Sequence, residues 1–156
     1  MAGSNYRVSI QQVAARPIAA VRARVAADRV SAEFARHLDQ VYAASRSNGL
    51  RLDGQNIFVY REAGDGFLEV DFGVGALANV PTVGAVRQTE TPAGRVAMTT
   101  HWGDYGVLGR AHDAVIRWCE ENGHERAGPR WEVYGHWTDD PTKVRTDVFY
   151  LLMAKG

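Results

Sequence analysis

The sequence predicts an α+β fold in which a duplicated strand-strand-helix-strand-strand unit forms an antiparallel sheet of about eight strands. Three observations predict it: segments that alternate between apolar and polar residues, two amphipathic helical stripes, and turn residues that recur 74 positions apart. Both helices are expected on one face of the sheet, with a ligand cleft between the halves. The chain of 156 residues fits one domain, which we divide into halves at 5–80 and 81–154.

The first half opens with two strands and a helix. Residues 6–13 alternate loosely, a break follows at Arg16-Pro17, and residues 18–25 alternate again. Ser31 is a suitable N-cap for a helix whose apolar stripe ends at Asn48-Gly49.

Two further strands complete the first half. Residues 56–62 and 67–74 alternate on either side of Asp65-Gly66, and Asp-Gly is a strong hairpin signal. The unit therefore reads strand, strand, helix, strand, strand.

The second half repeats this order. Asp104 is expected to cap a helix with an apolar stripe that includes Val115 and Cys119 and ends at Asn122-Gly123. The expected strands are 83–89, 95–102, 128–137 and 145–152.

The turn residues of the two halves coincide at an offset of 74. This offset relates Gly49 to Gly123, Gly54 to Gly128 and Tyr60 to Tyr134. The register then slips by about four residues, because the hairpin loop around Asp140-Pro141 is longer than its counterpart at Asp65-Gly66. We interpret the pattern as a duplication.

Strand alternation separates Glu132 and Tyr134 from Trp131 and Val133. Because both helices are expected on one face, the helix-free face is expected to be open and to carry the cleft. A carboxylate among aromatic rings attracts positive charge in a dry site. The residues expected on this open face are Phe58, Tyr60, Glu69, Glu132, Tyr134, Asp147 and Phe149.

Composition excludes several classes of protein. Eighteen basic and eighteen acidic residues balance, so the footprint of a protein that binds nucleic acid or anionic membranes is missing. No apolar run is long enough for a membrane span and no secretory signal is recognisable, so we expect a cytoplasmic protein. The single cysteine, Cys119, excludes an internal disulfide and suits a buried inert thiol.

We expect neither a metal nor a cofactor. The histidines lack a metal-ligand spacing, and His37 and His112 are expected on helix surfaces. The glycines at 73–75 imitate a dinucleotide fingerprint, but Pro81 stops the helix that would receive the pyrophosphate.

Motifs in the second half resemble the GyrI-like small-molecule-binding family, and the resemblance extends over nearly the whole chain. That family includes effector-binding domains of bacterial multidrug-responsive transcription activators and standalone gyrase-inhibitory proteins. The motifs that carry the resemblance are Trp102-Gly103-Asp104-Tyr105, Trp118-Cys119-Glu120-Glu121-Asn122-Gly123, Gly128-Pro129-Arg130-Trp131-Glu132-Val133-Tyr134, Asp140-Pro141 and Arg145-Thr146-Asp147-Val148.

The resemblance implies a duplicated fold, a cleft between its halves and a strand-borne glutamate that meets cationic ligands. That glutamate is Glu132 in this sequence. One branch of the family resembles hydrolases that open the cyclopropane of DNA-alkylating natural products. This sequence has Asp147 where the family often has glutamate, which shortens the reach of that side chain.

We therefore expect a standalone protein that binds an aromatic, amphipathic or cationic molecule and sequesters or senses a toxic compound. Because no helix-turn-helix segment precedes Tyr6, a one-chain transcription activator is not expected, nor is direct contact with nucleic acid; a protein partner or a homodimer would carry a signal. The expected ligand contacts are Phe58, Tyr60, His101, Trp102, Tyr105, Glu132, Tyr134, Trp137, Asp147 and Phe149.

Other interpretations stay open. In a hydrolase, a buried Glu132 with a pKa raised by desolvation would position a water or donate a proton to a strained cyclopropane, with Tyr134 or His101 orienting the substrate. Inhibition of a topoisomerase by protein contact is a weaker alternative, which the neutral charge balance does not support. Tyr60 and Tyr134 also fit ordinary cross-strand packing.

Overall fold

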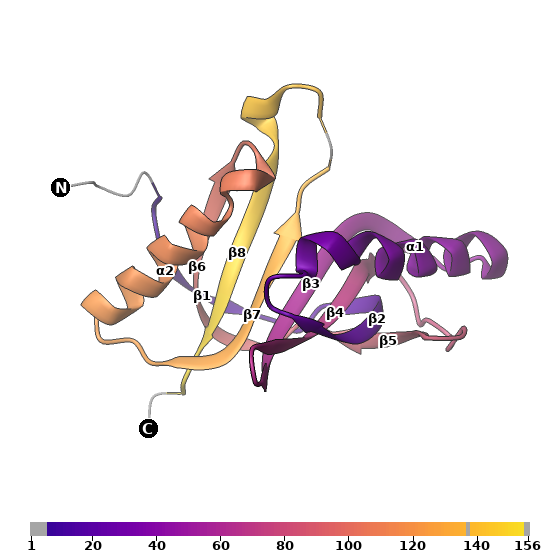
Figure 1. The fold of residues 1–156 in the computed structure, drawn as a ribbon, viewed down its shortest axis with the longest axis horizontal. Coiled ribbons are helices and arrows are strands. Elements are labelled where there is room, and N and C mark those ends of the chain that lie inside the picture. Colours follow the sequence, from indigo (N-terminus) through magenta and orange to yellow (C-terminus); the bar gives the residue numbers. More distant parts are fainter. Residues whose placement is uncertain (1–5, 137, 155–156) are drawn as a thin grey trace.

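The computed structural model describes residues 6–136 and 138–154. These residues form one antiparallel sheet of eight strands with two α-helices on one face, which confirms the predicted fold class (Figure 1). The elements are β1 (Ser9–Val13), β2 (Pro17–Ala26), α1 (Val30–Asn48), β3 (Leu52–Gly64), β4 (Phe67–Ala76), β5 (Val86–Glu90), β6 (Gly94–Trp102), the 3-10 helix η1 (Tyr105–Val107), α2 (Gly109–Glu121), β7 (Arg126–Tyr134), the 3-10 helix η2 (Pro141–Lys143) and β8 (Arg145–Leu152).

The strand order is symmetric about its centre. It reads β1-β6-β8-β7-β3-β4-β2-β5, and exchanging each strand for its counterpart in the other half gives the same order read from the opposite edge. At the central seam Phe58 pairs with Glu132, flanked by the pairs Ile57 with Val133 and Val59 with Trp131. With the offset of 74, this register places a pseudo-two-fold axis through the pair Phe58 and Glu132.

Each helix covers one half of the sheet through an apolar stripe. In α1 the buried stripe contains Leu38, Val41 and Ala44, and in α2 it contains Val115 and Cys119. The stripes pack on separate apolar clusters, α1 over β2, β3 and β4, and α2 over β6 and β8. Among the described residues, no helix is long and apolar enough to span a membrane.

Asp104 caps η1 and not α2 as predicted. Its side chain accepts a hydrogen bond from the backbone N–H of Gly106, and the α-helix begins only at Gly109. Glycine is a poor helix former. Gly106 and Gly109 lie only three residues apart, which favours a short 3-10 turn before the regular helix.

The helix-free face is a second core, so the expectation that it is the open face is wrong. Ile18, Ile57 and Val59 have no exposed surface there, and Trp131 stacks on Phe149 with ring centres 5.2 Å apart. These side chains come from both halves of the sheet and form one cluster.

The chain connections explain why the helix-free face closes. β1 lies at one edge of the sheet and β2 next to the other edge, yet only residues 14–16 join them. The turn between β5 and β6 runs beside this corner, because Thr91 N donates to Arg16 O and Arg16 N donates to Thr91 Oγ1, both at 2.9 Å. The sheet must therefore curl with its helix-free face inward.

The open part of the molecule lies instead on the helix side. α1 and α2 diverge over the sheet and leave β3 and β7 between them (Figure 1). Strand register places Phe58, Tyr60, Glu132 and Tyr134 on this side, with their neighbours in the helix-covered clusters.

Candidate functional site

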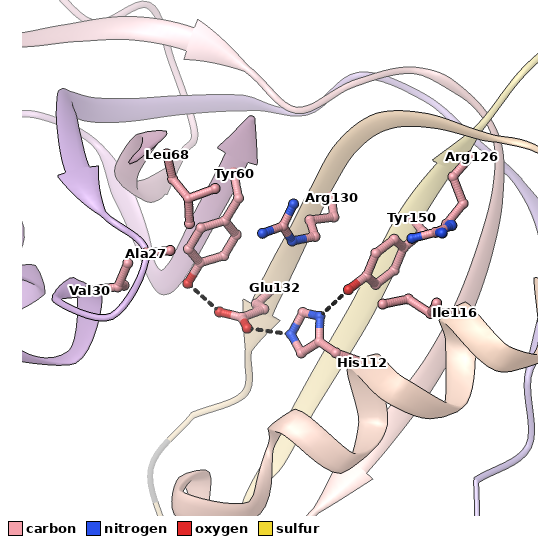
Figure 2. Close-up of a pocket in the computed structure, with 10 residues that line it drawn as sticks. All are labelled: Ala27, Val30, Tyr60, Leu68, His112, Ile116, Arg126, Arg130, Glu132 and Tyr150. Carbon is pink, nitrogen blue, oxygen red and sulfur yellow. Dashed lines mark hydrogen bonds and ion pairs between the residues drawn. The ribbon is translucent and has the colours of Figure 1, made fainter. Parts of the chain in front are cut away.

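A hollow of about 480 Å³ lies between the helices over the seam of the two halves. We call it the seam hollow. Its volume falls in the range of small-molecule pockets, about 300 to 1,000 Å³. Figure 2 shows its lining, drawn from both halves: Ala27, Val30, Tyr60, Leu68, His112, Ile116, Arg126, Arg130, Glu132 and Tyr150.

A second hollow of about 440 Å³ adjoins the first, and we call it the outer hollow. It shares Arg126, Arg130 and Tyr150 with the seam hollow. The two arginines and the tyrosine therefore lie at the boundary between the two spaces. The remaining lining of the outer hollow is Glu62, Glu120, His124, Glu125 and Gly128.

Glu132 is the buried acid of the seam hollow, with 6% of its surface exposed. The hydroxyls of Tyr60 and Tyr134 both donate to its Oε1 atom, at 2.6 and 2.5 Å. The two tyrosines are equivalent under the offset of 74. Symmetric donors thus converge on one carboxylate at the pseudo-two-fold axis.

His112 contacts the other oxygen of Glu132. Its Nε2 lies 2.6 Å from Glu132 Oε2, and its Nδ1 lies 2.7 Å from the hydroxyl of Tyr150 (Figure 2). A carboxylate only accepts hydrogen bonds, so Nε2 carries the hydrogen. The helix α2 and the strands β7 and β8 are connected through this chain of three side chains.

The hydrogen bonds keep Glu132 ionised. Burial alone would raise its pKa, but the hydrogen bond and charge of His112 and the two tyrosine hydroxyls outweigh burial and hold the pKa below its ordinary value. This direction is opposite to the raised pKa that the hydrolase interpretation of the sequence assumes. Burial and the charge of Glu132 raise the pKa values of Tyr60 and Tyr134 well above 10, so both stay protonated donors.

Tyr150 is likewise a protonated phenol at neutral pH, since burial raises its pKa to about 12. It can donate to Nδ1 of a neutral His112 or accept from that atom when the imidazole is charged. The chain of hydrogen bonds therefore persists in both states of the imidazole.

Two guanidinium groups line the seam hollow, those of Arg130 and Arg126. Arg130 Nη1 donates to Glu62 Oε2 at 2.9 Å, and its guanidinium lies 5.7 Å from the centre of the Tyr60 ring. Arg126 lies 3.8 Å from Glu120. The cleft is therefore not the acidic one expected from the sequence, because arginines outnumber carboxylates in its lining.

Aromatic side chains continue from Glu132 on the other side of the axis. The ring centres of Phe34 and Phe58 are 5.9 Å apart, those of Phe58 and Tyr134 5.1 Å, and those of Tyr134 and Tyr105 5.5 Å. We call these four residues the aromatic row. Three of them, Phe58, Tyr105 and Tyr134, are predicted ligand contacts that the fold brings together near Glu132.

Other predicted contacts lie on the opposite face of the sheet. Asp147 and Phe149 pair with Val133 and Trp131, and so face the closed core side. Glu69 lies on that side as well, because it pairs with Arg61, which follows the closed-side residue Val59 by two positions in β3. The expectation that these residues share a face with Glu132 is wrong, since the sheet alternation places them opposite.

His101, Trp102 and Trp137 complete the predicted set. His101 is buried on β6, where the Tyr6 hydroxyl lies 2.8 Å from its Nδ1 and the carbonyl oxygen of Asp104 lies 2.9 Å from its Nε2. Trp102 is exposed with the Arg145 guanidinium 5.5 Å from its ring. Neither is in the lining of the seam hollow, and Trp137 lies outside the described residues.

Sequence reasoning missed most polar groups of the seam hollow. His112 was expected on a helix surface, yet it reaches the sheet and is mostly buried. Its position was readable: it follows Leu108 by four residues and precedes Ile116 by four, which is the spacing of one helix face. The offset of 74 also relates it to the buried Leu38.

His37 was likewise expected on a surface and is buried. Its ring stacks on Phe72 with centres 4.9 Å apart, and neither ring nitrogen has a hydrogen-bond partner among the described residues. Burial lowers its pKa, and the nearby charge of Arg36 lowers it further against the opposing effect of Glu33.

Comparison with known proteins identifies relatives of this chain. The model of the GyrI-like small molecule binding domain matches residues 6–152. No curated protein sequence matches. The crystal structure of the EcmrR C-terminal domain is similar, with a TM-score of 0.77 and 17% identity over 96% of this chain and 98% of that chain.

Two other solved structures share the fold. SAV2435 bound to tetraphenylphosphonium has a TM-score of 0.72 and 12% identity over 94% of both chains. A hydrolase from Listeria innocua has a TM-score of 0.64 and 12% identity over 94% of this chain and 92% of that chain. At these identities the likeness concerns the fold.

Proposed function

Because this chain belongs to the family of GyrI-like small molecule binding domains, we propose that it binds an aromatic, amphipathic small molecule in the seam hollow and thereby sequesters or senses a toxic compound. The observation that carries the proposal is the seam hollow itself, about 480 Å³ in volume and placed where the two halves meet. Its floor is a buried, fully hydrogen-bonded polar cluster.

The walls of the seam hollow suit an apolar body. Val30, Leu68 and Ile116 supply aliphatic surface, and Tyr60 and Tyr150 supply rings. Burial of apolar ligand surface contributes about 25 cal/mol per Å² before the costs of binding. Tethering of the tyrosines by Glu132 and His112 lowers the entropy cost, because their rings are held in place before the ligand arrives.

Filling the seam hollow tests the proposal. Ile116→Trp adds bulk inside it, and Arg117→Trp adds the same bulk on the exposed face of the same helix. Fluorescence titration with pyrene-based amphiphiles should show at least about tenfold weaker binding for Ile116→Trp and unchanged binding for Arg117→Trp. Equal affinity of both variants and the wild type would remove the seam hollow as the binding site.

Hydrolysis of a strained cyclopropane electrophile is the second candidate function. The hydrogen-bonded chain from Tyr150 through His112 to the ionised Glu132 favours it, because such a chain can accept a proton from an attacking water. A structure of the same fold from Listeria innocua is described as a hydrolase, which supports hydrolysis as a candidate class of reaction. In this candidate Glu132 acts as a base, because the carboxylate is ionised, although its lowered pKa makes it a weak one.

Mass spectrometry separates the two functions. Purified protein is incubated with cyclopropane-containing alkylating compounds, and each compound is followed over time. A catalytic gain of the mass of water that disappears in Glu132→Gln would establish the hydrolase. Compounds that stay unchanged while bound in the seam hollow would establish binding alone.

Several predictions from the sequence accompany the proposal. They are a bacterial origin, a cytoplasmic location, a protein partner or homodimer that receives the signal, and no direct contact with nucleic acid. Topoisomerase inhibition stays a weaker sequence prediction.

A further inference from the structure

We infer that the ligand of the seam hollow carries an anionic group, such as a carboxylate or sulfonate, that is held between Arg126 and Arg130. This inference rests on the proposed function, because it names the chemical class of the ligand for the same site. It differs from the expectation that Glu132 provides the counter-charge for a cation.

Glu132 is poorly placed to attract a cation. Three side chains already donate to its two oxygens, at 2.6 Å from Tyr60, 2.5 Å from Tyr134 and 2.6 Å from His112. When the imidazole is protonated, His112 also balances the charge of the carboxylate. A cationic ligand would have to displace these donors in a buried place, which costs their hydrogen bonds.

The carboxylates that pair with Arg126 and Arg130 are, in contrast, exposed. Glu62 and Glu120, their ion-pair partners, have side chains that are 70% and 67% exposed. The arginines themselves are 37% and 23% exposed. Ion pairs with such exposed carboxylates contribute about 0 to 1 kcal/mol, so an anionic ligand can replace them at small cost.

The position of the guanidiniums suits an amphipathic anion. Both arginines lie on the helix side of β7, since they pair with Leu152 and Tyr150 of the helix-covered cluster. They line the seam hollow and the outer hollow together. A ligand whose apolar body lies against Val30, Leu68 and Ile116 would therefore place its charged end at the boundary between the two hollows. A guanidinium binds a carboxylate through paired hydrogen bonds.

Three glutamates in the lining of the outer hollow confine the charge of the ligand to the arginines, because carboxylates repel an anion. Glu62, Glu120 and Glu125 lie beyond the arginines, toward the outside. A ligand anion that leaves the arginines toward the outside is therefore repelled by these carboxylates. The favourable place for its charge is at the two guanidiniums.

Three probes with one apolar body test the inference: 1-pyrenebutyrate, 1-pyrenebutanol and 1-pyrenebutylamine. Fluorescence titration measures the affinity of each for the wild type and for Arg126→Gln, Arg130→Gln and the double variant. Arg87→Gln removes an exposed arginine of the edge strand β5 and serves as the control. Circular dichroism during heating verifies that each variant is folded.

We expect the wild type to bind the butyrate at least about tenfold more tightly than the amine, the scale of a charge-assisted hydrogen bond. Each arginine substitution should weaken butyrate binding about five- to tenfold and leave butanol binding within about twofold, with no effect of Arg87→Gln. Equal or tighter binding of the amine would overturn the inference, as would unchanged butyrate affinity in the folded double variant.

The probes also separate this inference from the proposed function. If all three bind with the same affinity and Ile116→Trp blocks them all, the small-molecule site stands and the anionic class fails. If none binds, the proposed site fails and the inference fails with it.

Discussion

The two halves of the molecule build the same unit from different side chains. The offset of 74 relates Val41 to Val115, both without exposed surface, and Gly49 to Gly123, with φ angles of 65° and 70°. Around the seam, however, the second half is polar where the first is apolar or neutral. The corresponding pairs are Leu38 and His112, Leu52 and Arg126, Asn56 and Arg130, and Phe58 and Glu132.

The difference between the halves distinguishes residues that the fold requires from residues that serve the site. The first half closes its layer with Leu38 and Phe58 buried in an apolar cluster. The second half buries His112 and Glu132 at the equivalent places, although charged groups lose hydration on burial. Since the first half shows that the unit forms without them, we attribute the polar pair to function.

Breaking the pair of His112 and Glu132 should have the largest effect on the stability of the protein. His112→Leu leaves the Glu132 carboxylate buried without its nitrogen donor, and we expect the free energy of unfolding to fall by about 3 kcal/mol. The double variant His112→Leu with Glu132→Leu gives the second half the apolar character of the first and should recover most of this loss. Urea denaturation measures both, and strictly additive losses would contradict the coupling.

The mirror substitution is the matched control. Leu38→His places an imidazole at the position equivalent to His112, in an apolar cluster where Phe58 stands in the place of the Glu132 carboxylate. It should cost about 2 to 3 kcal/mol, because a buried polar group gains no partner. A neutral effect of Leu38→His would mean that the two halves tolerate polarity equally.

The halves should also differ in the pH range where stability is lost. The folded pKa of His37, in the first half, is lowered from 6.5 by burial. The folded protein therefore binds fewer protons there than the unfolded chain, and stability falls as pH drops below about 6.5. Glu132, in the second half, has a folded pKa lowered from 4.5, so its contribution is complete above that value and is lost as pH falls through the folded pKa.

Substitutions can show which residue is responsible for the loss of stability in each of these two pH ranges. Urea denaturation between pH 7.5 and 3.5 should show that His37→Leu removes the upper part of the decline, and it should stabilise the protein at pH 5 by about 1 kcal/mol, the cost of an unsatisfied buried group. The double variant His112→Leu with Glu132→Leu should reduce the decline below pH 4.5 only. An unchanged upper range in His37→Leu would assign it to another group.

Substituting the turn glycines should have the smallest effect on stability, and the effect should be the same in both halves. Gly49 and Gly123 both have left-handed backbone angles after a helix, with open space where a Cβ would lie. Alanine at either position should cost about 1 kcal/mol in backbone strain. Thermal unfolding of Gly49→Ala and Gly123→Ala measures this, and clearly unequal losses would contradict the equivalence of the two turns.

The sequence predicted the fold well because its signals are local. Alternation placed β8 at its observed bounds, Arg145–Leu152, and Asn48-Gly49 marked the end of α1. Boundaries failed where the signal was mixed: β5 begins at Val86 and not at residue 83, and β1 begins at Ser9 and not at residue 6.

The face of the site could not be predicted in the same way. Alternation shows which residues share a face, and it correctly grouped Phe58, Tyr60, Glu132 and Tyr134. It does not show how a sheet curls, and the curl buries the helix-free face around Trp131. The hydrogen bond between His112 and Glu132 joins residues from different elements, so no local pattern contains it.

Glu132 and Phe58 face each other across the pseudo-two-fold axis, and this has a consequence for symmetric assembly. A homodimer of two identical halves can place only identical residues at that point. Two glutamates there would repel each other, and one would have to take up a proton. Two phenylalanines would leave the pair of tyrosine hydroxyls without an acceptor. Joining both halves in one chain allows a single carboxylate to receive two symmetric donors.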